Sequence, residues 1–173
     1  MYVRKTKKED IETVLRLYSD AREFMAENGN GGQWGTTYPS VSQLEDDMAE
    51  NASYVCIDET GESGELTENG IVGTFAYFYG NDPDPNYIKV YGGEWPDNRP
   101  YGVVHRITTL KGTHGVAVFC LDWAYEQCRH LRIDTHKNNI PMQKLVSKCG
   151  FEFCGEVKML NGDGTMRDAF MKI

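Results

Sequence analysis

The alternation of hydrophobic and polar residues predicts a chain in which strands and helices are interleaved. Apolar residues recur at three- and four-residue spacing over residues 11–24, which is typical of an amphipathic helix, and this helix is expected to end near residues 28–29. Capping-box patterns at residues 6–9 and 42–45 predict the start of this helix and of a second, shorter one that runs to about Glu50. Two helices are therefore expected before the main run of strands.

Runs rich in β-branched and aromatic residues predict strands over residues 3–6, 54–57, 71–79, 87–91, 101–109, 131–135, 151–160 and 166–173. A mostly buried helix is expected from residue 115 to about 129, and another from the cap Asn138 to Lys148, stopped by residues 149–150. The last two strands are expected to form a hairpin around residues 161–164. The order β-α-α-β-β-β-β-α-β-α-β-β predicts a mixed α/β sheet.

Three connecting segments differ in composition from the rest of the chain. Residues 30–39 and 92–100 form glycine-containing loops with large aromatic side chains, which a plain connector does not need. Residues 58–70 are charged and contain glycine, so a solvent-exposed hairpin excursion is expected there. The two aromatic loops are the better candidates for binding.

Composition narrows the class of protein. The length of 173 residues fits one domain with a substantial core. No apolar run is long enough to span a membrane and no signal peptide is recognised, so a cytoplasmic protein is expected. Lys and Arg number 18 against 26 Asp and Glu, giving a net charge of -8. This acidity disfavours binding to nucleic acid or to a membrane, and mildly favours a cationic substrate.

The five cysteines argue against a disulfide framework and against a zinc site. Their number is odd, they lie far apart and no CxxC pair occurs. No histidine adjoins any of them, so a catalytic cysteine is also disfavoured. No metal is expected.

The junction between the strand over residues 101–109 and the following helix is the clearest candidate for a ligand site. The start of a helix leaves backbone N–H groups unpaired, and Gly112 and Gly115 allow close approach of an anion without a nearby cation. The alternative is that Gly115 only permits a tight turn. Neither a Walker loop nor a complete dinucleotide fingerprint is present.

Two motifs together resemble the GNAT superfamily of N-acetyltransferases over nearly the whole chain. Residues 112–117, Gly-Thr-His-Gly-Val-Ala, match the Gly-x-Ala half of the family's helix-opening motif. Residues 132–151 resemble the family's next strand, helix start and Lys-x-Gly-Phe ending. The matching positions there are Asn139, Leu145, Lys148, Gly150 and Phe151.

This resemblance implies a single GNAT-like domain over residues 1–173, with a mixed, mostly antiparallel central sheet flanked by helices. It implies transfer of an acetyl group from the cosubstrate acetyl-CoA to a primary amine of a small molecule or peptide, by direct attack. The cofactor-binding residues that it implies are Ile107, Thr108, Thr109, Gly112, Thr113, His114, Gly115, Val116, Ala117, Val118, Asn139, Met142 and Lys148. Lys111 is a further candidate to help hold the diphosphate of the coenzyme.

The sequence departs from the family pattern at two positions. Gly112 replaces the usual Arg or Gln, in a loop about two residues shorter than is typical, and the backbone amides of residues 114–118 are expected to hold the diphosphate instead. Val146 replaces the tyrosine that acts as general acid in many members. The proton-transfer role must therefore lie elsewhere or be absent.

An ammonium acceptor must lose a proton before attack, which calls for a base. The catalytic candidates are His105, Glu94, Tyr101 and His136. A purely structural role for each histidine remains open. The candidates for the acceptor pocket are Trp34, Tyr38 and Trp95, since aromatic faces attract cations; ordinary anchoring of the loops is the alternative.

Two other functional hypotheses are weighed, and the first of them stays open. A catalytically silent acyl-CoA-binding or sensing module would account for the missing tyrosine and the shortened loop. A nucleotide-phosphate binder would need a magnesium-holding Asp after a strand, and no good candidate is found. The terminal hairpin could offer an edge for a homodimer.

Overall fold

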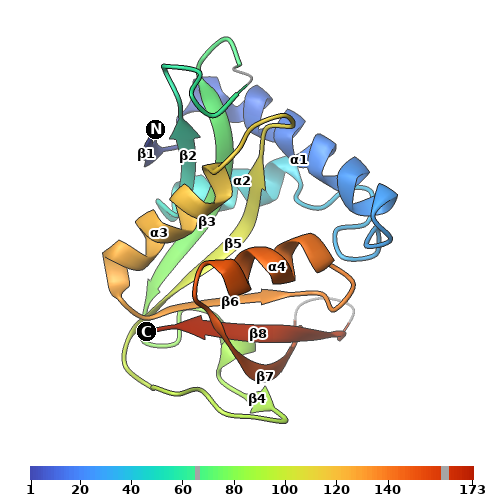
Figure 1. The fold of residues 1–173 in the computed structure, drawn as a ribbon, viewed down its shortest axis with the longest axis vertical. Helices are drawn as coiled ribbons and strands as arrows, with labels where there is room; N and C mark the ends of the chain where they lie inside the picture. Colours follow the sequence, from blue (N-terminus) through green and yellow to red (C-terminus); the bar gives the residue numbers. More distant parts are fainter. Residues whose placement is uncertain (65–66, 161–163) are drawn as a thin grey trace. The chain divides into compact units, whose positions relative to one another are not determined.

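A computed structural model describes residues 1–64, 67–160 and 164–173. Within these residues, eight strands form a mixed, mostly antiparallel sheet in the order β1-β2-β3-β5-β6-β8-β7-β4 (Figure 1). The chain divides into two compact units. Unit 1 comprises residues 1–77 and 105–123, and unit 2 comprises residues 78–104 and 124–173. The fold class expected from the sequence is confirmed, whereas a single domain over residues 1–173 stays a prediction.

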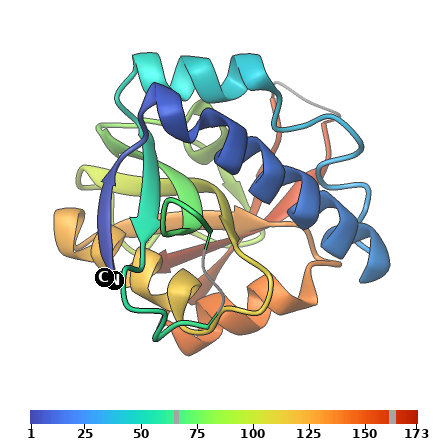
Figure 2. The same cartoon turned by 90° about the horizontal axis from the view of Figure 1, so that it is seen from above.

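Unit 1 joins two helices to the first strands of the sheet. Its elements are β1 (Tyr2–Lys5), α1 (Ile11–Glu27), α2 (Val41–Ala49), β2 (Ser53–Ile57), most of β3 (Ile71–Gly80), the second part of β5 (Tyr101–Thr109) and the first part of α3 (Val116–Cys128). The strand pairs β1–β2 and β2–β3 are antiparallel. Figure 2 shows α1 in dark blue and α2 in cyan beside these strands.

The core of unit 1 forms where the apolar faces of α1 and α2 meet the strands. Its buried residues are Val14, Leu17, Tyr18, Trp34, Leu44, Val55, Ile57 and Ile71. Leu17 and Tyr18 come from the helix-spaced apolar run, and Val55 and Ile57 alternate along β2, so both periodicities point into one cluster.

Unit 2 contains the later strands. Its elements are the 3₁₀ turn Pro85–Tyr87, β4 (Val90–Tyr91), the first part of β5, the end of α3, β6 (Leu131–Thr135), α4 (Ile140–Lys148), β7 (Glu152–Lys158) and β8 (Met166–Lys172). β5 and β6 pair in parallel through Gly102 and Leu131, while β6–β8, β7–β8 and β4–β7 are antiparallel. The core of this unit includes Tyr87, Tyr101 and Val103.

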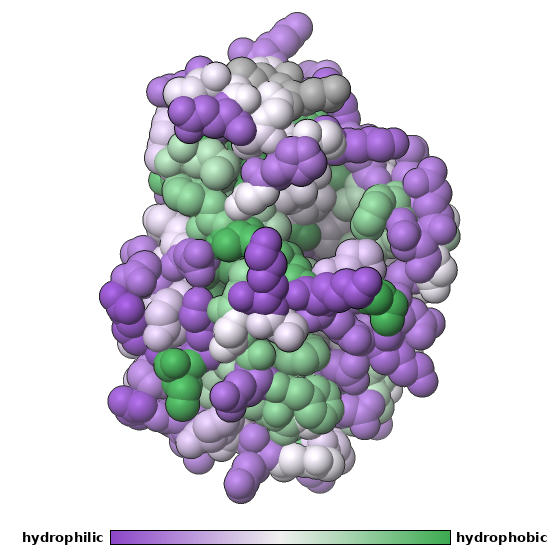
Figure 3. Space-filling view, viewed as in Figure 1, coloured by the Kyte–Doolittle hydropathy of each residue, from purple (hydrophilic) through white to green (hydrophobic). Residues whose placement is uncertain are grey.

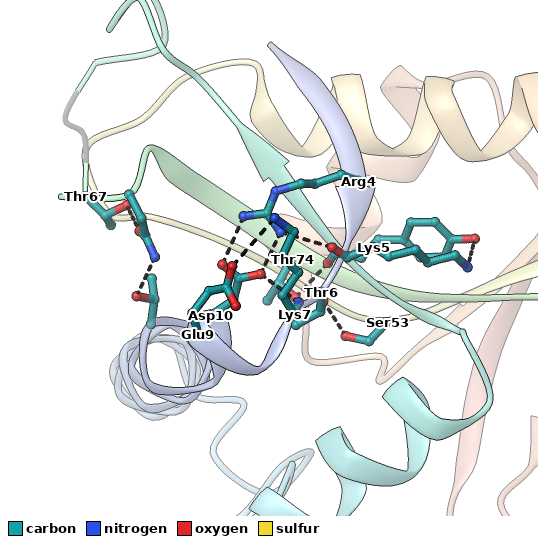
Figure 4. A network of polar contacts seen from close by, with 12 residues as sticks. Arg4, Lys5, Thr6, Lys7, Glu9, Asp10, Ser53, Thr67 and Thr74 are labelled. Carbon is teal, nitrogen blue, oxygen red and sulfur yellow. Dashed lines mark hydrogen bonds and ion pairs between the residues drawn. The ribbon is translucent and has the colours of Figure 1, made fainter.

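Both capping boxes expected from the sequence are wrong, because other residues start the two helices. The Thr6 hydroxyl bonds the Ser53 hydroxyl at 2.7 Å instead of capping a helix (Figure 4). The chain enters α1 through a 3₁₀ turn, Lys8–Asp10, in which the Asp10 carboxylate accepts the Lys7 N–H at 2.8 Å. Ser40 caps α2, and its hydroxyl accepts the Gln43 N–H. At the start of α1, a tertiary contact thus engages the hydroxyl that the sequence offers as a cap.

Other differences are local. The strand expected over residues 87–91 is reduced to Val90–Tyr91, because Pro85 starts a 3₁₀ turn that ends at Tyr87. The cap of α4 is Asn139, one residue beyond the expected Asn138. The hairpin turn expected at residues 161–164 lies largely outside the described residues.

Two general findings concern the helices and the surface of the described residues. Across the part of the chain that the structure describes, no helix combines the length and apolar character that a bilayer crossing requires. Hydrophilic residues occupy much of the face drawn in Figure 3, with hydrophobic residues visible between them.

Candidate functional site

The loop between β5 and α3 is tightly turned, and its shape depends on two glycines. Gly112 and Gly115 have φ values of +84° and +76°, a left-handed conformation that glycine adopts readily. Thr113 closes the turn, since its N–H and its hydroxyl both donate to the Leu110 carbonyl, at 3.2 and 2.6 Å. The predicted helix follows at once and begins at Val116.

The start of α3 presents a row of backbone donors. The N–H of Phe119 donates to the Gly115 carbonyl at 2.9 Å and so makes the first bond of the helix. The amides of residues 115–118 precede this bond and have no acceptor within the helix. A Cβ placed on Gly115 would meet no atom of the described chain within 4 Å, so there is open space at this glycine. The residues present therefore fit an anionic group bound at the helix start.

The predicted set of amides was one residue too long. His114 was expected to contribute its N–H, but this group donates to the Ser63 carbonyl at 2.7 Å. An amide that is already bonded at this distance is not available to a ligand unless that bond breaks. The amides of residues 115–118 remain as donors for an anion. We call these four residues the cradle, and residues 110–114 the cradle loop.

Ser63 belongs to the segment over residues 58–70, and the expectation that this segment is a solvent-exposed excursion is wrong for Asp58 and Ser63. Both residues are buried. The Asp58 carboxylate accepts four hydrogen bonds, from the N–H and hydroxyl of Thr60 at 3.0 and 2.9 Å, and from the N–H and hydroxyl of Ser63 at 2.9 and 2.6 Å. The bonds from Ser63 hold the pKa of Asp58 well below its usual range.

This depressed pKa predicts how stability changes with pH. A carboxyl group whose pKa is lower in the folded state stabilises that state above its unfolded pKa of about 3.9 and loses this contribution as the pH falls below it. The variant Asp58→Asn should therefore melt below the wild type at neutral pH, with a gap that narrows as the pH falls below about 4. Thermal melts of both proteins at several pH values measure this gap. A gap that stays constant into the acidic range would contradict the assignment.

A second polar cluster in unit 1 is buried and was not expected from the sequence. Arg106 has a φ of +55°, which is uncommon for a residue other than glycine. Its guanidinium binds both carboxylate oxygens of Asp47, at 2.8 and 2.7 Å, and donates to the Tyr38 hydroxyl at 3.0 Å. The side chains of Arg106 and Asp47 are only 9% and 3% exposed. The ion pair thus holds together β5, α2 and the loop that carries Tyr38.

One sequence signal could have identified Asp47. It lies three residues after Leu44 on α2, and both are buried, so a carboxylate occupies the apolar face of a short helix. Such a charge needs a partner. That the partner is Arg106, 59 residues away, could not be read from the spacing.

The loop over residues 30–39 carries two candidate aromatic residues, Trp34 and Tyr38, which differ in exposure. Trp34 is a core residue, 8% exposed, with its ring 5.9 Å from that of Tyr18 and 6.1 Å from that of Tyr38, both edge-on. Tyr38 is 39% exposed. Trp34 therefore anchors the loop, and Tyr38 is the aromatic that a ligand can reach. His105 is partly buried on β5, directly before Arg106.

In unit 2, two of the candidate aromatics stack on a buried arginine. The guanidinium of Arg132 lies 3.7 Å from the ring centre of Tyr101 and 4.1 Å from that of Trp95. Burial raises the pKa of Tyr101 to about 12, so its hydroxyl stays protonated at neutral pH and is poorly suited to act as a base. The Trp95 indole donates to the Tyr87 carbonyl at 2.7 Å. This stack gives both rings a structural role, and a role for either of them toward a ligand stays a prediction.

The remaining candidates of unit 2 lie around α4 and in the loop over residues 92–100. The Asn139 side chain caps α4 by accepting the Met142 N–H at 3.2 Å. His136 accepts the Asn138 N–H at 3.2 Å through Nδ1. Glu94 and Lys148 are exposed. The observed contacts give Asn139 a structural role, and a role for any of these residues toward a ligand stays a prediction.

Comparison with known proteins connects this geometry to a family. No protein-family model and no curated protein matches the sequence. A solved GNAT-family acetyltransferase from Streptococcus agalactiae is similar, with 27% identity, a TM-score of 0.81, and coverage of 99% of this chain and 94% of the other.

Two further solved structures share the fold at lower identity. A ribosomal-protein-alanine N-acetyltransferase from Brucella melitensis shows 19% identity and a TM-score of 0.61, covering 100% of this chain and 99% of its own. A chain of the NatC complex bound to Gag peptide and CoA shows 15% identity and a TM-score of 0.58, covering 98% of this chain and 94% of its own. The resemblance seen in the two sequence motifs is confirmed.

Proposed function

We propose, from the premise that this chain has the fold of the GNAT acetyltransferases, that it moves an acetyl group from acetyl-CoA to a primary amine of a small molecule or peptide. The observation that carries the proposal is the start of α3, where the amides of residues 115–118 have no acceptor within the helix and the space at Gly115 is open. The NatC structure, which shares the fold, contains CoA and a peptide.

On the coenzyme side, the cradle would hold the diphosphate by backbone donors and the helix dipole. Acetyl-CoA, when bound, supplies the thioester carbonyl that the amine attacks. By the family resemblance, its pantetheine arm is expected along the backbone of residues 107–109, directly before the cradle loop. Alignment by such contacts contributes up to about 7–11 kcal/mol to lowering a barrier. The roles expected of Asn139, Met142 and Lys148 stay predictions.

On the acceptor side, two of the predicted candidates in unit 1 are not buried. They are the exposed Tyr38 and the partly buried β5 residue His105. The Tyr38 hydroxyl accepts a bond from Arg106, so its own proton is left to donate to a ligand. Its ring face can attract an ammonium group. His105 is the candidate in this unit that can take the proton which the ammonium must lose. Glu94 and His136 stay predictions for the same role.

The variant Tyr38→Phe tests the acceptor assignment with the smallest change. Losing one hydroxyl contact costs about 0.5–1.5 kcal/mol, so KM for the amine should rise about 2- to 12-fold. The Kd of CoA should stay unchanged. Steady-state kinetics and calorimetry measure the two quantities, and Tyr79→Phe, an exposed tyrosine on β3, is the matched control. An unchanged KM for the amine would remove Tyr38 from the acceptor site.

The proposed function itself is tested by release of free thiol from acetyl-CoA in the presence of a panel of amines and peptides. Amine-dependent thiol release, together with an acetylated product identified by mass spectrometry, is the expected result. Binding of CoA without turnover for any acceptor would indicate a silent acyl-CoA-binding module. A chain that does not bind CoA would contradict the proposal.

A further inference from the structure

We infer that the segment over residues 58–64, here called the Asp58 loop, positions the cradle for the diphosphate, with Asp58 and Ser63 as its positioning residues. This inference rests on the proposed function, because it concerns the same coenzyme site. Neither residue is expected to touch the coenzyme. They act through the loop over residues 110–114, whose conformation aims the amides that follow.

The first support is a continuous chain of hydrogen bonds within unit 1. Asp58 follows β2 directly and is fully buried, with its two carboxylate oxygens each accepting two bonds from Thr60 or Ser63. Ser63 is thereby held through both its N–H and its hydroxyl. Its carbonyl in turn accepts the His114 N–H at 2.7 Å. One buried carboxylate thus fixes the residue that precedes Gly115.

The second support is a close approach of the two backbones. A Cβ on Gly64 would lie 2.5 Å from the Gly112 carbonyl oxygen and 3.5 Å from the Thr113 Cα, and the φ of Gly64 is +122°. No side chain fits there without moving one loop. The Asp58 loop is therefore packed against the cradle loop along its backbone as well as hydrogen-bonded to it.

The cradle has a physical need for such a support. Gly112 stands where a cationic or amide side chain is usual, so binding depends on the direction of the backbone donors. Hydrogen bonds weaken steeply as their angle departs from linearity. The two glycines that shape the loop also make it conformationally permissive. A loop fixed by Asp58 would keep the donors of residues 115–118 aimed at one place.

The test compares two acetyl donors that share the thioester and the pantetheine arm. Acetyl-CoA carries the diphosphate, whereas S-acetyl-pantetheine does not. In the variant Asp58→Asn, kcat/KM for acetyl-CoA should fall about 10-fold, which corresponds to the loss of about one charge-assisted bond to the diphosphate. For S-acetyl-pantetheine it should change less than about 2-fold, within what one neutral bond contributes. Ser63→Ala removes only the hydroxyl bond, and should give a smaller change in the same direction.

Glu62→Gln is the matched control, since Glu62 is an exposed carboxylate of the same loop. Removal of a negative charge near an anionic coenzyme strengthens its binding if it has any effect. Weaker use of acetyl-CoA in Asp58→Asn, with unchanged or stronger use in Glu62→Gln, therefore separates positioning from net charge. Thermal melts show that each variant is folded at the assay temperature.

The possible results are distinct. An equal fall for both donors, or no fall for either, would overturn the positioning role and leave Asp58 as a residue that only stabilises the fold. Should Asp58→Asn not fold, the donor comparison in Ser63→Ala decides by the same criterion. A wild-type protein that neither binds CoA nor turns over either donor would instead contradict the proposed function.

Discussion

Replacing Gly115 by valine should weaken coenzyme A binding about 100-fold or more. The new side chain would occupy the open space at this glycine and separate the diphosphate from the amides at the start of α3. Loss of two hydrogen bonds to a charged group costs about 1.5–3 kcal/mol each, which corresponds to at least this factor in Kd. Isothermal titration calorimetry with CoA measures the effect.

A second glycine provides the control for backbone strain. Gly29, after the end of α1, has a φ of +74° against +76° for Gly115, and a Cβ there also meets no atom within 4 Å. Gly29→Val should therefore carry a similar conformational cost without loss of CoA affinity. Equal CoA affinities in the two valine variants would mean that the cradle has been placed wrongly.

Replacing Asp47 by alanine should have the largest effect on stability. The change leaves the guanidinium of Arg106 buried without its bidentate partner, and removing one member of a buried ion pair costs about 3–5 kcal/mol. For a chain of this length, that loss corresponds to a fall in Tm of about 6–20 °C. Thermal unfolding followed by circular dichroism measures it.

The neighbouring residue on α2 offers a matched control. Asp46 is exposed, and Asp46→Ala removes the same charge from the same helix, so its Tm should stay close to that of the wild type. The double variant Asp47→Leu with Arg106→Met removes both charges and should recover much of the lost stability. A Tm of Asp47→Ala equal to that of Asp46→Ala would show that the pair does not stabilise the fold.

Elements whose signal is local could be predicted from the sequence. The strands over residues 101–109 and 131–135 were expected with the bounds that the structure shows, and the first of them is rich in β-branched residues and is ended by a glycine-containing loop. Helix starts were less accurate. Thr6 has the right chemistry for a cap, yet its hydroxyl bonds Ser53 on β2, a contact that only the folded chain creates. Neighbouring candidates such as Asn138 and Asn139 also have the same capping chemistry, and the sequence does not rank them.

The candidate site likewise combines features that are local in the sequence with contacts between distant residues. The cradle could be proposed from the sequence because the strand, the glycines and the helix start are contiguous in it. Tyr38 and His105 could likewise be proposed from the sequence, but the ion pair of Arg106 with Asp47, which also bonds Tyr38, could not, because it joins separate elements. The bond from His114 to the Ser63 carbonyl is equally non-local, and it changed both the set of amides assigned to the cradle and the interpretation of the Asp58 loop.

Proton–nitrogen correlation NMR of the protein titrated with CoA tests the central claim most directly. If the amides at the start of α3 hold the diphosphate, the signals of residues 115–118 should shift strongly with CoA and little with pantetheine, which lacks the diphosphate. Strong shifts at other amides with CoA, while those of residues 115–118 stay in place, would contradict the assignment.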